Sequence, residues 1–203
     1  DAAKKFPAIQ NISIDLENGN NQNLGISLCV VAPVKYYDAD VIKRSLDNPR
    51  SSISGWVDNV KGLRQLVEDI FVHQKYTLYC KSGFTMYLTQ ANIQYNRGHM
   101  DRSTRTNEIL TKAIPNPHLQ SYNCMGGHRD VICKAIEQTN FELAFAQLIA
   151  STANLSFDDL TVMQSFFTGS EYMQNGRIAC LVDADGVYWT PQKLISKNAG
   201  GNE

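Results

Sequence analysis

The residue of this chain best suited to nucleophilic chemistry is Cys124, which stands in the segment PNPHLQSYNCMGGHRD at residues 115–130. The prolines at the start of this segment exclude a regular helix or a central strand there. A Gly-Gly pair follows shortly after the cysteine and allows a sharp turn, and a helix is expected from about residue 128. A thiol near a helix N-terminus feels the positive end of the helix dipole, which favours the reactive thiolate. The segment therefore indicates either a nucleophile at the mouth of a helix or a turn that holds an inert thiol.

Two histidines and three backbone amides near the cysteine are candidate partners for such a nucleophile. His118 and His128 lie on either side of Cys124 in the sequence and are candidates for a general base or a hydrogen-bond donor. The amides that follow the cysteine are candidate donors for a developing oxyanion, and they belong to Met125, Gly126 and Gly127. A cysteine hydrolase with one of the histidines as its base is thus one possible function.

A metal site in the same segment has little support. Its possible ligands would be His118, Cys124, His128 and Cys133, but the last two are five residues apart on the expected helix and point about 140° from each other. The chain has no Cys-x-x-Cys pair of the kind that structural zinc sites use. It also lacks a glycine-rich phosphate-binding loop with a lysine. We therefore expect no metal and no cofactor.

Composition and charge narrow the range of partners and compartments. The formal net charge of −1 gives no overall field that would draw the protein to nucleic acid or acidic lipid. The longest apolar run, GISLCVVAPV, is about half the roughly 20 residues that a membrane-spanning helix needs. We expect neither a nucleic-acid nor a membrane partner. Five cysteines without regular spacing do not resemble a disulfide framework and favour a reducing, cytoplasmic setting.

Residue patterns predict an α+β order of elements around the cysteine. Strands are expected over residues 11–16 and 25–34, a helix over 56–70, and a hairpin formed by 76–80 and 84–95 with its turn at Lys-Ser-Gly. A polar loop is expected over 96–107, two helices after the cysteine with Asn140 capping the second, a third over 160–167, and a last hairpin around Asp-Gly in DADG. We predict a single α+β domain over residues 1–195, an antiparallel sheet flanked by helices, followed by a flexible tail at 196–203.

This order of helix, hairpin, polar loop, Pro/Asn/His cluster, cysteine and helices resembles the ubiquitin-conjugating enzyme fold. The run NPHLQSYNCMGGH, followed by ICKAIEQTNFELAFAQLIASTANLSFDD, is similar to divergent bacterial and phage relatives of those enzymes, and the likeness spans about residues 56–167. The resemblance implies that Cys124 accepts a ubiquitin-like modifier as a thioester from an activating enzyme and passes it to an amine. The family's His-Pro-Asn tripeptide appears here in reversed order as Asn116-Pro117-His118, which makes Asn116 and His118 the candidates for its role. A non-catalytic protein-binding module of the same fold is a further alternative.

Overall fold

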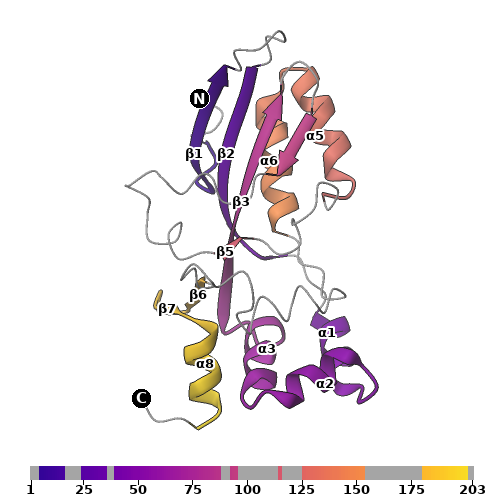
Figure 1. Cartoon of the computed structure of the whole chain (residues 1–203), viewed down its shortest axis with the longest axis vertical. Helices are drawn as coiled ribbons and strands as arrows, with labels where there is room; N and C mark the ends of the chain where they lie inside the picture. The colour runs from indigo at the N-terminus through magenta and orange to yellow at the C-terminus, as the bar shows by residue number, and fades with distance from the viewer. Residues whose placement is uncertain are drawn as a thin grey trace. The chain divides into compact units, whose positions relative to one another are not determined.

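The computed structural model describes residues 5–16, 24–35, 39–87, 92–95, 114–115, 125–153 and 180–200. Within these residues the chain forms seven strands and six helices, a mixed α+β arrangement (Figure 1). The chain divides into two compact units. The sheet–helix unit comprises Asp1–Ala32, Cys80–Thr111 and Pro115–Asn154, and the helical unit comprises Pro33–Tyr79, Lys112–Ile114 and Leu155–Glu203. The expectation of one domain over residues 1–195 stays a prediction.

The sheet–helix unit contains strands that follow one another across the sheet in chain order. Strand β1 (Ile9–Leu16) pairs antiparallel with β2 (Leu24–Pro33), which lies beside β3 (Tyr76–Tyr87). The Cys80–Tyr87 part of β3 pairs antiparallel with β4 (Asn92–Tyr95). Two strands were expected here as separate elements before the hairpin, and both form at the predicted places. A short strand, β5 (Ile114–Pro115), also pairs with β3.

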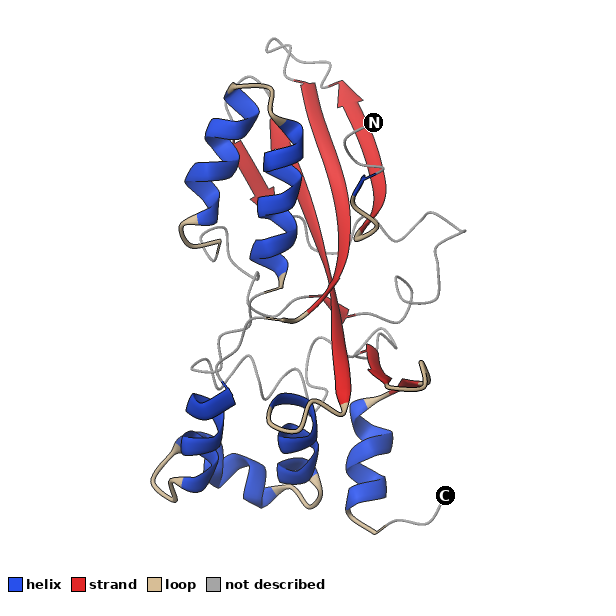
Figure 2. Cartoon of the chain, turned by 180° about the vertical axis from the view of Figure 1, so that it is seen from behind, coloured by secondary structure: helices blue, strands red, loops and turns tan. Residues whose placement is uncertain are grey.

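Two helices cover one face of this sheet, as Figure 2 shows. They are α5 (His128–Glu137) and α6 (Phe141–Thr152), and they pack against each other. The side chain of Asn140 accepts a hydrogen bond from the Leu143 amide at 3.1 Å, which confirms the predicted cap of α6. The core between helices and sheet is formed by Leu28, Val30, Ala32, Phe84, Met86, Met125, Ile132, Ala135, Ile136, Ala144, Phe145 and Leu148. This apolar contact is what fixes the start of α5 against the sheet.

The hairpin predicted from residues 76–80 and 84–95, with its turn at Lys-Ser-Gly, is wrong; the hairpin that forms lies within 84–95, where Phe84–Tyr87 pairs with Asn92–Tyr95. Strand β3 continues without a break through Lys81, Ser82 and Gly83, and the pairing with β4 begins at Phe84. Lys81 and Ser82 are both buried. Burial in the sheet therefore overrides the local turn preference of these polar and small residues, because β-structure depends on context more than on local propensity.

The helical unit is built from α1 (Ala39–Asp47), α2 (Ser52–Asn59), α3 (Leu63–Phe71) and α8 (Pro191–Asn198). Helices α1, α2 and α3 pack on one another, and α8 packs on α3. The single helix expected over residues 56–70 is in fact α2 and α3, separated at Val60–Gly62. Helix α2 ends at Asn59 because Val60 is extended, and Gly62, the N-cap of α3, has a left-handed φ of +85°, which a continuous α-helix cannot contain. The last residues of α8 belong to the segment that was expected to be a tail.

The helical unit also contains the second predicted hairpin. The Tyr76–Tyr79 part of β3 pairs with β6 (Cys180–Asp183), which pairs antiparallel with β7 (Tyr188–Trp189). The turn lies at the Asp-Gly pair, as predicted, and Gly186 has a φ of +80°. The expected loop over residues 96–107 and the third helix over 160–167 lie outside the described residues.

Candidate functional site

The structure describes four of the seven residues predicted for the cysteine site. Met125, Gly126, Gly127 and His128 lie at the start of α5. The remaining three, Asn116, His118 and Cys124, lie outside the described residues. The geometry of the site can therefore be built from the turn that directly follows the cysteine in the chain.

Met125–Gly127 form a tight turn that enters α5. The Met125 side chain is only 7 % exposed and belongs to the core of the sheet–helix unit. Its carbonyl accepts a hydrogen bond from the His128 amide at 3.1 Å, and the Gly126 carbonyl accepts from the Arg129 amide at 3.4 Å. The chain turns because Gly126 has a φ of +53°, a conformation that side chains disfavour. The turn is thus anchored on its inner side by an apolar side chain.

None of the described residues covers the outer side of the same turn. A Cβ atom placed on Gly126 or on Gly127 would meet no described atom within 4 Å. Gly127 is the N-cap of α5, and within the described part of the chain no side chain caps this helix start. The amides of His128 and Arg129 already donate to carbonyls of the turn, so the candidate donors are the amides of Met125, Gly126 and Gly127, which lie next to the positive end of the helix dipole. An incoming carbonyl oxygen would therefore find donors and a favourable potential at this turn.

His128, the first residue of α5, is held by a residue of α6. Its ring nitrogen Nδ1 lies 2.7 Å from the side-chain oxygen Oε1 of Gln147. The half-buried pair fixes the plane of the imidazole at the edge of the turn. The sequence pattern singled out His128 but offered no signal for Gln147, which lies 19 residues further along the chain.

The four described cysteines form no disulfide with one another, and they differ from Cys124 in sequence context. Cys29, Cys80 and Cys180 are buried, as predicted for the first two. Cys133 is half-buried, and burial raises the pKa of its thiol, with Asp130 and Glu137 adding to the effect and Arg129 opposing it. A raised pKa lowers the fraction of thiolate, so Cys133 is a weak nucleophile at neutral pH.

The described residues show neither a cluster of metal-ligating side chains nor a membrane-spanning helix. No group of three or more His, Cys, Asp or Glu side chains among them is arranged to hold a metal ion. None of their helices combines the length and apolar character needed to cross a bilayer.

Comparisons with known proteins add no relative. Neither protein-family models, nor curated proteins, nor solved structures match this chain.

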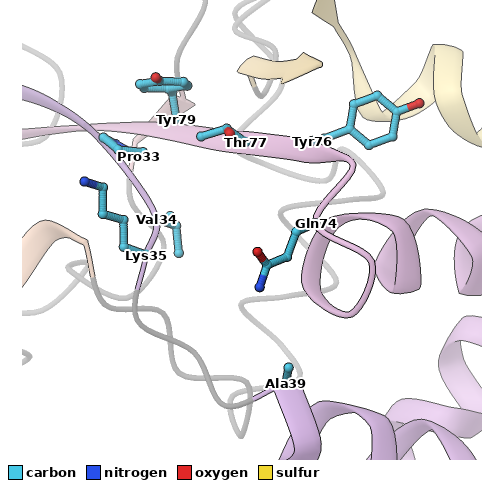
Figure 3. Close-up of a pocket in the computed structure, with 8 residues that line it drawn as sticks. All are labelled: Pro33, Val34, Lys35, Ala39, Gln74, Tyr76, Thr77 and Tyr79. Atoms are coloured by element: carbon cyan, nitrogen blue, oxygen red, sulfur yellow. The ribbon is translucent and has the colours of Figure 1, made fainter. Parts of the chain in front are cut away.

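A second candidate site is a pocket of about 510 Å³ within the helical unit (Figure 3). It lies beside the first residues of β3, where the chain leaves β2 and enters α1. Lys35 and Gln74 border it on two sides, and Ala39 lies across from the strand (Figure 3). The lining residues come from separate parts of the chain between residues 33 and 79. No local motif unites them, and the sequence analysis therefore missed this site.

Proposed function

We propose that the chain is a ubiquitin-conjugating-enzyme-like protein that carries a ubiquitin-like modifier as a thioester on Cys124. The observation that carries the proposal is the Met125–Gly127 turn that directly follows this cysteine. The turn is anchored in the core by Met125, covered on its outer side by none of the described residues, and continuous with the start of α5. A thioester enzyme needs an accessible thiol beside backbone donors, and this turn offers such surroundings.

The order of elements in the sheet–helix unit supports the same proposal. Four strands lie side by side in chain order, and the cysteine segment comes after the last of them. Two helices then pack on one face of the sheet (Figure 2). The strand hairpin, the cysteine segment and the two helices after it come in the order that the resemblance to ubiquitin-conjugating enzymes implies, while the helix expected before the hairpin corresponds to α2 and α3 of the helical unit.

The proposed reaction makes and breaks one acyl bond in each step. The Cys124 thiolate attacks the thioester of an activated modifier, and the thiolate of the activating enzyme leaves. A substrate amine then attacks the new thioester, an amide forms, and the Cys124 thiolate is released while the amine loses a proton. Both steps develop negative charge on the carbonyl oxygen, which the amides of the turn would stabilise.

Mass spectrometry of the intact chain tests this proposal. The chain is incubated with a ubiquitin-like modifier, its activating enzyme and ATP, and the expected product is an adduct that thiols remove. Cys124→Ser should give an adduct that resists thiols, because an oxygen ester replaces the thioester. Cys133→Ser is the matched control and should form the adduct as the parent does. An adduct that persists in Cys124→Ala would contradict the proposal.

A cysteine hydrolase is the second candidate, and the His128–Gln147 hydrogen bond favours it. A general base on a cysteine nucleophile is usually oriented by a third group, and Gln147 occupies such a position relative to His128. His128→Ala separates the two candidates. Loss of the histidine should leave formation of the thiol-sensitive adduct intact in a conjugating enzyme, whereas it should abolish turnover in a hydrolase that uses His128 as its base.

The non-catalytic alternative makes a prediction of its own about thiol reactivity. A protein-binding module has no need for a reactive Cys124, and iodoacetamide should then modify it no faster than it modifies Cys133. The proposed conjugating function predicts that Cys124 is alkylated first in the native protein, since three of the other cysteines are buried and Cys133 has a raised pKa.

A further inference from the structure

We propose that the pocket beside β3 binds a small organic carboxylate with an apolar body. A volume of about 510 Å³ is in the range of pockets that hold metabolite-sized ligands, and it is far larger than a simple inorganic ion requires. All lining residues belong to the helical unit. The inference is independent of the cysteine site, whose described residues belong to the sheet–helix unit.

The charged residue that lines the pocket favours a negatively charged ligand. Lys35 is exposed, and none of the described carboxylates forms an ion pair with it. The described lining contains no Asp or Glu. The neighbouring Lys75 is different, because its ammonium group lies 2.9 Å from the Asp69 carboxylate and is already neutralised. Among the described residues Lys35 therefore presents one positive charge without a paired carboxylate, which suits a monoanion.

The polar groups around Lys35 favour a ligand that accepts hydrogen bonds. Gln74 contributes an amide and Thr77 a hydroxyl, and neither side chain bonds to another described residue. In Figure 3, the Gln74 amide reaches toward the open space from the side opposite Lys35. In Figure 3 the Lys35 ammonium points away from Gln74, so both exposed side chains have to turn toward the ligand for one carboxylate oxygen to pair with Lys35 and the other to accept from the amide.

Part of the remaining wall, which also includes Tyr76 and Tyr79, can hold an apolar body on the same ligand. Pro33, Val34 and Ala39 line the pocket near the lysine. Val34 is held against β3 by a 2.8 Å hydrogen bond from its amide to the Leu78 carbonyl, so this wall is fixed by the sheet. An organic acid with a ring or a short aliphatic chain can bury its apolar part here and leave its charge at Lys35.

Gln74 is held in a conformation that glycine would adopt more easily. Its φ is +52°, in the left-handed region. The residues on each side are pinned, because the His73 amide donates to the Glu68 carbonyl at 2.8 Å and the Lys75 amide donates to the Asp69 carbonyl at 2.7 Å. Gln74 thus keeps a strained backbone conformation at a place where its side-chain amide borders the pocket.

NMR titration of the full chain with the Cys124→Ala substitution tests the proposal. The three probes are benzoate, benzamide and benzylamine, which are similar in shape and differ in charge. Benzoate should bind with a Kd on the order of 1 mM and shift the amide signals of Lys35, Gln74 and Thr77. Neutral benzamide and cationic benzylamine should bind at least about 10-fold more weakly, because they lack the charge that pairs with Lys35. Equal binding of benzoate and benzamide would overturn the proposal.

Two substitutions test the named residues with matched controls. Lys35→Gln should weaken benzoate binding about 10-fold, whereas Lys43→Gln, which removes an exposed lysine of α1, should leave it unchanged.

Gln74→Gly should raise the Tm and weaken benzoate binding, because it relieves the left-handed strain and deletes the amide. Thr139→Gly relieves a second left-handed non-glycine residue of the described chain, at φ +56°, and should raise the Tm without any effect on binding. Unchanged benzoate binding in Lys35→Gln or in Gln74→Gly would contradict the assigned role.

Discussion

The Nδ1 atom of His128 lies 2.7 Å from the Oε1 atom of Gln147, and this hydrogen bond joins the first turn of α5 to the middle of α6. An amide oxygen can only accept, so Nδ1 must carry the proton. In the neutral imidazole the other nitrogen, Nε2, then holds the lone pair. The pair of helices thus fixes the tautomer of the histidine that stands four residues after Cys124.

Gln147→Leu should release this tautomer. With the acceptor gone, the ¹⁵N NMR spectrum of the His128 ring is expected to change from one tautomer to a mixture of two. The free energy of unfolding should fall by about 1 kcal/mol, the usual value of one hydrogen bond. Gln138→Leu replaces an exposed glutamine at the end of α5 and is the control. A single Nδ1–H tautomer in Gln147→Leu would show that another group holds the ring.

Gly62→Ala should be one of the most destabilising single-methyl changes in the helical unit. The added Cβ atom would lie 2.4 Å from the Ile195 carbonyl oxygen of α8, and the φ of +85° is unfavourable for alanine. Together these effects should cost at least about 2 kcal/mol in urea unfolding. Gly55→Ala is the matched control, since its Cβ would meet nothing within 4 Å inside α2. It should instead stabilise the protein by about 0.5–1 kcal/mol.

Ser82→Ala should leave the stability unchanged or raise it. The Ser82 hydroxyl is buried in β3 and has no hydrogen-bond partner among the described residues. Removing it therefore removes the cost of burying an unpaired polar group, about 1–3 kcal/mol at most. Ser54→Ala is the control, because the equally buried Ser54 hydroxyl bonds to Asp58 and Arg64 at 3.3 and 3.1 Å. A loss of stability in Ser82→Ala as large as that in Ser54→Ala would contradict this account.

Local signals in the sequence predicted those elements whose ends are determined by nearby residues. The cap of α6 depends on Asn140 and an amide three residues away. The β6–β7 turn depends on Asp183 and the glycine that follows it closely. The turn before α5 was likewise predicted from Gly126 and Gly127, and the positive φ at Gly126 is the reason. In each case the interacting groups are within a few residues of one another.

Features that depend on distant parts of the chain were not predicted. Helices α2 and α3 separate at Gly62, which has to be a glycine because α8, more than 120 residues later in the chain, passes against it. The turn expected at Lys81–Gly83 does not form because β3 runs through these residues and buries Lys81 and Ser82. Gln147 and the pocket lining also come together only through the fold. Burial and long-range packing therefore decide the parts that local patterns cannot show.

Acid should weaken the β6–β7 hairpin through Asp183. The indole N–H of Trp189 donates to the Asp183 carboxylate at 2.8 Å. This hydrogen bond is the main cause that holds the pKa of Asp183 below its usual value, and backbone amides such as that of Val187 lower the pKa further. Because the folded pKa is lowered, the stabilising contribution is complete above the ordinary value of about 3.9 and is lost as the pH falls below it. The Trp189 indole signal in NMR should therefore titrate with a midpoint below about 3.9, and a midpoint at or above that value would refute the prediction.

Asp183→Asn should loosen the hairpin even at neutral pH. The asparagine keeps one oxygen, which can still accept from the amides of Asp185 and Val187 at the positions now 3.0 and 2.8 Å away. Its NH₂ group then faces the Trp189 indole, so that two donors meet and that hydrogen bond is lost. Faster hydrogen exchange of the Trp189 indole is the expected result. Asp185→Asn changes an exposed side chain of the same turn and should leave this exchange rate as it is. Equal exchange rates in the two variants would mean that the Asp183 carboxylate does not hold the indole in solution.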